Sequence, residues 1–341
     1  MELYLDSVNL KEIEEAFKLG TLAGLTTTPT FMHREGVKDI DAMILKLASM
    51  VPVLQVEALG RTAEEVEKEA QRLISLGLNR AKTVFKIPVS LEGIRACKML
   101  RDKGLLVNVH LIYTLQQAYM AANAGATYVC PLVGRLQDQG HDALALVEQC
   151  VNMVIDYAYD TKIMFSSVRH AEHVRNAINL GVHTITVPWN VLKKLTENNF
   201  TELGTKQFYD HTLLLTARVS EVIRSENPVV GLNDSVLDAT LKMSESGLGA
   251  VSVINGDGAL IGVFTDGNLR RALKEKGRGL LDEKMSGFTY TEPISLRSDD
   301  VLEHAVALIK QHKIDNLVVV EDDRPIGMLD IQDLVKLGVI G

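Results

Sequence analysis

Short apolar runs rich in β-branched residues alternate with longer stretches that carry apolar residues at three- and four-residue spacing, as in Ala63–Leu76 and Leu91–Leu100. The runs have the length of strands, and the stretches are typical of helices that pack on a sheet. The alternation repeats about eight times before residue 200, which predicts a (β/α)8 barrel of the α/β class. The predicted strands are Glu2–Asp6, Leu22–Thr26, Val53–Glu57, Thr83–Ile87, Val107–Leu111, Tyr128–Leu132, Ile163–Ser167 and Thr184–Val187.

The predicted strands end in polar or reactive residues. Since a barrel gathers the carboxyl ends of its strands on one face, these side chains are expected to share one site. They include Asp6, Thr26, Thr28, Gln55, Lys86, His110, Arg135, Ser167 and Arg169.

Lys86 stands out because it lies inside the apolar run Thr83–Ile87, directly before a strand-ending proline. A lone ammonium group in such a run is unfavourable unless it is paired or loses its proton. A neutral lysine amine at the end of a strand can attack a carbonyl and form a Schiff base. The alternative is a structural lysine held in an ion pair.

The pattern changes after residue 200. Gln207–Ile223 reads as one amphipathic helix, and Ser225 to Pro228 mark a domain boundary. Beyond it, Val236 to Ala239 return as Val301 to His304, and Gly262 returns as Gly327, which gives an internal repeat of 65 residues. We predict a barrel over 1–205, a helix and linker over 206–227, and a paired repeat over 228–341.

Composition narrows the function classes. The 341 residues include 46% hydrophobic residues, and the net charge is −8 with a pI near 5.6. This acidic balance without a basic run argues against a nucleic-acid partner. The sequence shows no leader or membrane-spanning segment, so we expect a cytoplasmic protein. Cys97, Cys130 and Cys150 share no zinc spacing, so reduced thiols and no metal site are expected.

The segments MELYLDS, LAGLTTTPT, TVFKIP, NVHLIYT, YVCPLVGR and MFSSVRH occur in this order within residues 1–220. Together they resemble the fructose-6-phosphate aldolase and small transaldolase family. The resemblance implies that Lys86 forms a Schiff base with a phosphorylated sugar or hydroxyketone donor, with an aldehyde as acceptor and no further cofactor. It places Asp6 as the proton-transfer carboxylate and Gln55 as the residue that holds the catalytic water.

The same resemblance implies that Arg135, Ser167 and Arg169 bind the substrate phosphate, and planar guanidinium groups suit that ligand. Asn108 is kept as in the family. A C-terminal helix that packs on a neighbouring subunit implies a homo-oligomer.

Three positions depart from the family pattern: Thr28 replaces an asparagine that holds donor hydroxyls, His110 replaces a threonine, and Leu132 replaces an aromatic residue. Thr26 and Thr28 are still expected to contact the donor. His110 is either an added acid or base, since the ordinary pKa of histidine is about 6.5, or a packed histidine bonded to a carbonyl.

The repeat, with the segment GVFTDGNLRRAL, resembles the tandem CBS domains of arabinose-5-phosphate isomerases. Such pairs bind adenine nucleotides through a threonine hydroxyl and a ribose-binding carboxylate. The matching residues are Thr265 in the first copy and Asp333 in the second. A purely structural pair is the alternative.

The leading hypothesis is therefore a Schiff-base aldolase or transaldolase of phosphorylated sugars with a C-terminal module for ligand sensing or assembly. One alternative is a regulatory protein that binds a sugar phosphate and a nucleotide without turnover. Another is a lyase or isomerase that uses Lys86 together with His110.

Overall fold

The computed structural model describes residues 1–224 and 226–340. The chain divides into two compact units, Met1–Glu197 and Asn198–Gly341. The predicted barrel limit at residue 205 lies inside a helix of the second unit, and Ser225 of the predicted linker lies outside the described residues.

The first unit is a closed barrel of parallel strands, which confirms the predicted fold class. Each strand pairs with the next along the chain, and β1 closes the ring against β8. The seventh strand ends before Ser167, since that residue adopts a positive φ of 60°. The strands are β1 (Glu2–Asp6), β2 (Gly24–Thr26), β3 (Leu54–Glu57), β4 (Thr83–Pro88), β5 (Leu106–Ile112), β6 (Tyr128–Pro131), β7 (Lys162–Phe165) and β8 (Thr184–Val187).

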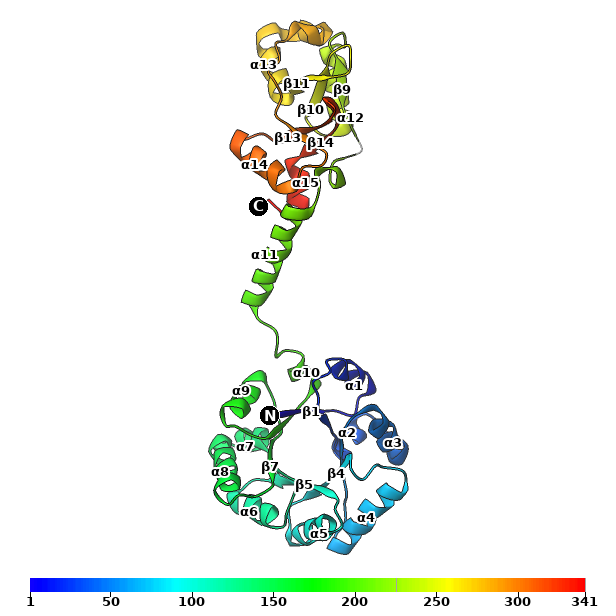
Figure 1. The fold of residues 1–341 in the computed structure, drawn as a ribbon, viewed down its shortest axis with the longest axis vertical. Coiled ribbons are helices and arrows are strands. Elements are labelled where there is room, and N and C mark those ends of the chain that lie inside the picture. The colour runs from blue at the N-terminus through cyan, green and yellow to red at the C-terminus, as the bar shows by residue number, and fades with distance from the viewer. Residues whose placement is uncertain (225, 341) are drawn as a thin grey trace. The chain divides into compact units, whose positions relative to one another are not determined.

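Helices surround the ring of strands (Figure 1). Several begin at a serine or threonine whose hydroxyl accepts a backbone N–H of the first turn, as Thr62, Ser90 and Thr114 do, which fixes where each helix starts. The helices are α1 (Leu10–Phe17), α2 (Pro29–Arg34), α3 (Ile40–Met50), α4 (Ala63–Ser75), α5 (Leu91–Asp102), α6 (Leu115–Asn123), α7 (Val133–Asp138), α8 (Ala143–Asp156), α9 (Ala171–Asn179) and α10 (Trp189–Leu192).

The strands alternate between two environments. Leu54, Val56 and Phe85 pack in the large core between the strands and the surrounding helices. Tyr4 and Val84 belong to a smaller cluster that fills one end of the barrel interior. Since alternate residues of a strand face opposite sides, the positions that follow these interior residues by two also face inward. They carry the polar side chains of the site described below.

The second unit begins with α11 (Asn199–Thr216), which differs from the predicted helix over Gln207–Ile223. The helix starts early because the Asn198 side chain accepts the N–H groups of Phe200 and Thr201. It ends at Ala217 because the chain becomes extended there and Val219 N donates to Asp300 O at 2.9 Å. Val219 is apolar because it is fully buried, although it lies outside the helix. It therefore extends the apolar pattern of the sequence past residue 216.

Each repeat forms a three-stranded sheet, in the orders β11-β10-β9 and β12-β13-β14. The sequence missed the short strands β9 and β12, which pair in parallel with the next strand. The elements are η1 (Val219–Glu221), β9 (Val229–Gly231), α12 (Val236–Ser246), β10 (Ala250–Ile254), β11 (Leu260–Thr265), α13 (Asp266–Lys276), η2 (Gly277–Asp282), η3 (Met285–Gly287), β12 (Ser295–Arg297), α14 (Leu302–His312), β13 (Asn316–Glu321), β14 (Arg324–Asp330) and α15 (Ile331–Lys336).

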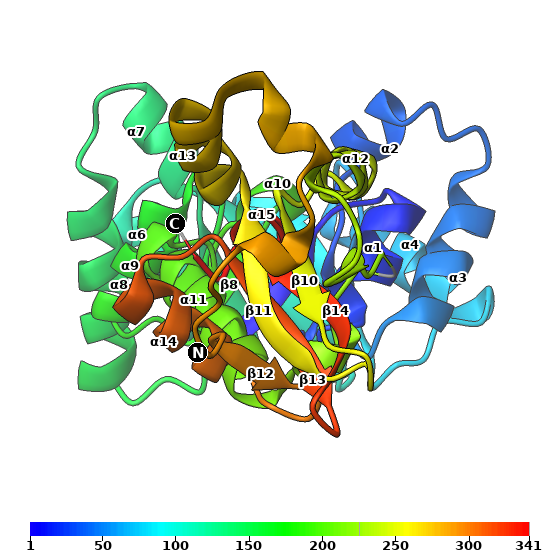
Figure 2. The same ribbon diagram turned by 90° about the horizontal axis from the view of Figure 1, so that it is seen from above.

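The two repeats share a small core. Leu248 and Ala250 of the first repeat are buried together with Val318 and Met328 of the second, and β10, β11, β13 and β14 can be followed in Figure 2. The predicted pairing of the repeats is therefore present, because each sheet covers an apolar face of the other.

Two leucines of the repeats test this arrangement with one substitution. Leu302 is fully buried, whereas Leu237 is 43% exposed. Leu302→Ala should lower the free energy of unfolding by about 2 to 5 kcal/mol, because it leaves a cavity. Leu237→Ala should change it by about 0.5 kcal/mol or less. Calorimetry of the full chain measures both, and equal losses would contradict the burial described here.

Candidate active site

A cavity of about 680 Å³ opens at the carboxyl ends of the barrel strands. It is lined by Asp6, Thr26, Thr28, Lys86, Asn108, His110, Arg135, Ser167 and Arg169, all of which the sequence singled out, and also by Glu57 and Arg34, which it did not. The barrel thus brings nearly all of the predicted site residues to one cavity. Gln55 is the exception among the barrel residues, since it is fully buried and does not belong to the lining.

Lys86 lies on β4 with 5% of its surface exposed. Its Nζ donates to the backbone oxygen of Thr27 at 2.6 Å and to Glu57 Oε1 at 2.9 Å. Lys86 is therefore ion-paired, as expected of a structural lysine, and it also lines the cavity, as expected of a reactive one.

Glu57 is the residue that sequence analysis missed. It ends β3, where it pairs with Lys86 of β4, and its second oxygen Oε2 lies 3.0 Å from His110 Nε2. The signal was present in the sequence, because Glu57 follows Gln55 by two positions and so shares its inward face. A glutamate at the carboxyl end of a barrel strand is a site candidate for the same reason as Lys86.

The charges of this cluster shift the pKa values of its members. Burial acts to raise the pKa of Glu57, but the neighbouring Lys86 and His110 outweigh it and hold that pKa below its ordinary value. Burial lowers the pKa of His110, and the opposing effect of Glu57 does not restore it. At neutral pH the pair therefore consists of a carboxylate and a neutral imidazole.

Asp6 lies across the barrel on β1. Thr26 Oγ1 donates to Asp6 Oδ1 at 2.8 Å, and the Thr26 hydroxyl also contacts that of Thr186. Burial raises the pKa of Asp6, although Lys86 and the Thr26 hydroxyl act in the opposite direction. A carboxyl group whose pKa is raised in this way is suited to exchange a proton with a bound substrate.

Gln55 bonds to Asn108 rather than to the lysine. Asn108 Nδ2 donates to Gln55 Oε1 at 2.7 Å, and both side chains are fully buried. Among the described residues, the β3 side chain that contacts Lys86 is Glu57. Gln55 is thus outside the lining but bonded to Asn108, which belongs to it.

Three residues expected to bind phosphate follow β6 and β7. Arg135 lies on α7 and its Nη1 is 3.4 Å from the Tyr113 hydroxyl, while Arg169 forms an exposed ion pair with Asp138 at 3.0 Å. Gly134 lets the two loops approach closely, because a Cβ there would lie 2.0 Å from Ser167 O. Ser167 and Arg169 therefore pack closely against Gly134, and Arg135, Ser167 and Arg169 all line the cavity.

Thr28 has a local structural role in addition to lining the cavity. Its hydroxyl accepts the N–H of Phe31 at 3.2 Å and so caps α2. Leu132, another departure from the family pattern, also contributes to the lining.

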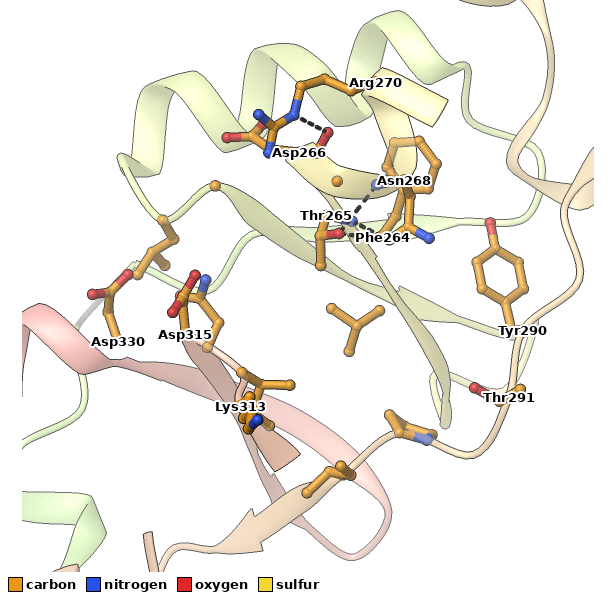
Figure 3. Close-up of a pocket in the computed structure, with 18 of the residues that line it drawn as sticks. Phe264, Thr265, Asp266, Asn268, Arg270, Tyr290, Thr291, Lys313, Asp315 and Asp330 are labelled. Atoms are coloured by element: carbon orange, nitrogen blue, oxygen red, sulfur yellow. Dashed lines mark hydrogen bonds between the residues drawn. The ribbon is translucent and has the colours of Figure 1, made fainter. Parts of the chain in front are cut away.

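The second unit contains a larger cavity, of about 1000 Å³, between its two repeats. Figure 3 shows Thr265 and Arg270 on the side of the first repeat and Lys313, Asp315 and Asp330 on the side of the second. The Thr265 hydroxyl and the Asn268 side chain cap α13 reciprocally. The cavity thus has charges of both signs around a hydroxyl at the start of a helix.

Asp333 of the second copy lies outside this cavity. Its carboxylate accepts from Arg224 Nε at 2.8 Å and from Arg224 Nη2 at 2.9 Å, and it is not part of the lining of this cavity. Thr265 of the first copy lines the cavity, and Asp333 of the second copy does not.

Residues 1–224 and 226–340 lack two kinds of feature. No group of three or more His, Cys, Asp or Glu side chains there is arranged to hold a metal ion. In the same part of the chain, no helix is both long enough and apolar enough to cross a bilayer.

Comparison with known proteins gives two family matches. The model of the Transaldolase/Fructose-6-phosphate aldolase family matches residues 3–229, and the CBS domain model matches residues 219–275 and 287–339. The "Probable transaldolase 2" of Bacillus anthracis is 38% identical over 215 residues, which are 61% of this chain and 96% of that protein. The "Probable transaldolase" of Desulforudis audaxviator is 38% identical over 220 residues, which are 64% and 100%.

Among solved structures, the CBS domain of a CBS-domain-containing membrane protein from Sphaerobacter thermophilus is similar to the second part of the chain. It is 19% identical, covers 41% of this chain and 98% of that chain, and gives a TM-score of 0.35.

The lowered pKa of His110 has a consequence for stability. Below about pH 6.5 the unfolded chain binds a proton at this histidine that the folded chain does not yet bind. The free energy of unfolding should therefore decrease as the pH falls from 7 to 5. His110→Asn removes this contribution, so its melting temperature should fall less steeply over that range. Calorimetry at several pH values measures the slopes.

The control is His312→Asn, which removes an exposed histidine of α14. If His110→Asn gives the same slope as the unsubstituted protein, the folded chain does not disfavour the imidazolium at this site.

Proposed function

Because this chain belongs to the transaldolase/fructose-6-phosphate aldolase family, we propose that it is a class I enzyme that cleaves or forms a C–C bond of a phosphorylated sugar through a Schiff base on Lys86. The observation that carries this proposal is the position of Lys86. Its amine is buried, lines the cavity, and lies among the acid and base groups Asp6, Glu57 and His110.

The chemistry begins when the neutral Lys86 amine bonds to the ketone carbon of the donor and the ketone oxygen leaves as water. The resulting iminium withdraws electrons from the bond between the carbons α and β to it. When the hydroxyl on the β carbon loses its proton, that bond breaks. The β carbon leaves as an aldehyde, and the donor fragment remains as an enamine. Transfer of the fragment to a second aldehyde is a transaldolase reaction, and protonation followed by hydrolysis is an aldolase reaction.

Asp6 is the group that we assign to the hydroxyl proton. It lines the cavity from β1, opposite the strands that carry Lys86 and His110, and Thr26 fixes one of its oxygens. A buried carboxyl group with a raised pKa accepts a proton more readily than an exposed one.

Arg135, Ser167 and Arg169 are proposed to bind the phosphate of the substrate. The proposal is supported by the two guanidinium groups and one hydroxyl in the lining of the cavity, and by the close packing of Ser167 and Arg169 against Gly134. Charge-assisted hydrogen bonds of this kind orient a substrate as well as hold it.

For the second unit we propose that an adenine nucleotide binds in the cavity beside Thr265. The hydroxyl at the start of α13 and the nearby Arg270 and Arg271 support an anionic ligand there. Asp333 does not support it, because its carboxylate is engaged by Arg224. The alternative role of the pair, assembly without a ligand, is favoured by the shared core of the repeats.

We also propose that α11 joins copies of this chain into a homo-oligomer. The helix has no buried residue, and it exposes large apolar side chains that include Phe200 at 85%, Phe208 at 74% and Tyr209 at 74%. Such a surface is unfavourable in water unless another chain covers it.

The first test is chemical trapping of the imine. Borohydride added with dihydroxyacetone should reduce a Schiff base on Lys86 and add the mass of the reduced donor to that residue. Lys86→Met should give no adduct and no C–C bond turnover while the chain remains folded. Peptide mass spectrometry locates the adduct, and circular dichroism checks the fold. An unlabelled Lys86 would favour the alternative of a binding protein without turnover.

The second test concerns the phosphate. Arg135→Ala should reduce kcat/KM for glyceraldehyde 3-phosphate. The loss should correspond to about 1.5 to 3 kcal/mol of transition-state stabilisation, because a charged hydrogen bond is lost. The value for glyceraldehyde should change little. The matched control is Arg175→Ala, which removes an exposed arginine paired with Glu172. Equal losses for the phosphorylated and the plain aldehyde would show that Arg135 does not bind the phosphate.

A further inference from the structure

Glu57 joins Lys86 to His110 through one carboxylate. Its Oε1 lies 2.9 Å from Lys86 Nζ, and its Oε2 lies 3.0 Å from His110 Nε2. All three side chains are almost fully buried, with exposed fractions of 6% for Lys86, 7% for Glu57 and 11% for His110. Water therefore competes little for these contacts, and Glu57 lies within 3.0 Å of both the amine and the imidazole.

The barrel fixes this arrangement. Glu57 of β3 is the register partner of Lys86 on β4, and His110 of β5 is the partner of Pro88, two positions beyond Lys86. Lys86, Glu57 and His110 thus come from adjacent strands and face the same interior. Strands of a closed barrel hold their side chains more rigidly than loops do, which suits groups that exchange protons.

The protonation states follow from the surroundings. The charged groups that act on His110 are Glu57, Lys86 and Arg135, and with burial they leave its pKa lowered. A neutral imidazole has one nitrogen that carries a proton and one that can accept a proton, and Nε2 is the nitrogen of His110 that lies beside Glu57.

We propose that Glu57 and His110 form the proton relay for imine formation at Lys86, which rests on the Schiff-base function proposed above. Glu57 accepts a proton from the Lys86 ammonium group, and the neutral amine then forms its bond to the ketone carbon. The nitrogen proton of the adduct passes to the former ketone oxygen, giving a hydroxyl.

Glu57, with His110 beside its other carboxylate oxygen, then returns the first proton to that hydroxyl. The C–O bond breaks, water leaves and the nitrogen lone pair forms the C=N bond of the iminium. One proton is taken up and one is released, so no co-reactant is needed. Glu57 is ionised again at the end and stands as the counter-ion of the iminium.

The division of labour with Asp6 is geometric. Asp6 is on β1, and the relay is on β3 and β5, so the two sets approach a bound donor from different sides of the barrel. Asp6 is held by Thr26, whereas Glu57 is held by Lys86 and His110. The relay therefore serves the making of the imine, and Asp6 serves the C–C bond step.

Rapid-quench trapping tests the relay. The full chain is mixed with dihydroxyacetone, borohydride is added after set times, and intact mass spectrometry gives the rate constant of adduct formation. Glu57→Gln should slow this rate by about 10²- to 10⁴-fold, the range for loss of general acid–base catalysis. The matched control is Glu64→Gln, which alters an exposed glutamate paired with Arg95 and should leave the rate within about twofold.

His110 provides a second variant in case Glu57→Gln does not fold. His110→Ala should slow trapping by about tenfold or more, the lower range for one proton-transfer partner. Added imidazole should restore part of the rate, which a purely structural histidine would not allow. The rate of the unsubstituted protein should also fall at acid pH as His110 gains a proton, and His110→Ala should lose the part of this fall that the histidine causes.

The outcomes separate the two proposals. If Lys86 of the unsubstituted protein is labelled but Glu57→Gln and His110→Ala react at its rate, only the relay is overturned. If His110→Ala is slow and imidazole has no effect on it, the histidine is structural and the relay is likewise overturned. If the unsubstituted protein gives no adduct, the relay and the Schiff-base function both fail.

Discussion

A buried ammonium group needs a compensating negative charge, and the Lys86–Glu57 pair meets this need inside the barrel. Taking an ion out of water costs several kcal/mol even after the protein relaxes, so an unpaired lysine at 5% exposure would be strongly unfavourable. The carbonyl of Thr27 and the carboxylate of Glu57 both accept from Nζ. The Glu57 carboxylate must itself stay ionised while buried. His110, which lies beside its second oxygen Oε2, contributes to this. The charge state of each residue in the site therefore depends on its neighbours: Lys86 depends on Glu57, and Glu57 depends on Lys86 and His110.

The closed barrel explains why these groups meet although they are far apart in the sequence. Asp6 and Lys86 are separated by most of three βα units, yet both line one cavity because alternate residues of every strand face the interior. The same faces carry Gln55 and Asn108, whose side chains are joined by a hydrogen bond. Asn108 is the register partner of Lys86 and lines the cavity, whereas Gln55 is buried outside the lining. The hydrogen bond therefore links a residue of the cavity wall to the buried interior of the barrel.

Much of the barrel and of its cavity could be predicted from the sequence. Hydrophobic periodicity indicates the strands and helices, and the ends of the strands indicate the face where a site forms. Lys86 and Asp6 were found by that argument, and the structure brings them to one cavity. Glu57 was missed because the resemblance to a family points to Gln55 on the same strand. Strand alternation, which places Glu57 on the same inward face, was not followed further. The end of α11 was also missed, because Val219 continues an apolar pattern while its backbone leaves the helix to bond to Asp300. Such a contact between distant segments leaves no local signal in the sequence.

The repeats show where sequence equivalence stops being a guide to chemistry. Gly262 and Gly327 occupy matching positions, but they are crowded to different degrees. A Cβ on Gly262 would lie 2.5 Å from the Tyr290 ring, and one on Gly327 would lie 3.2 Å from Ile223 Cδ1. The segment at Gly327 also supplies the Arg224 side chain that holds Asp333. A ligand that sought Asp333 would have to displace a two-point ion pair, whereas the cavity beside Thr265 holds no such internal competitor for its hydroxyl beyond the helix cap. The two halves of the repeat are therefore chemically unequal, and any ligand of this unit meets one open cavity and one carboxylate already occupied by the chain itself.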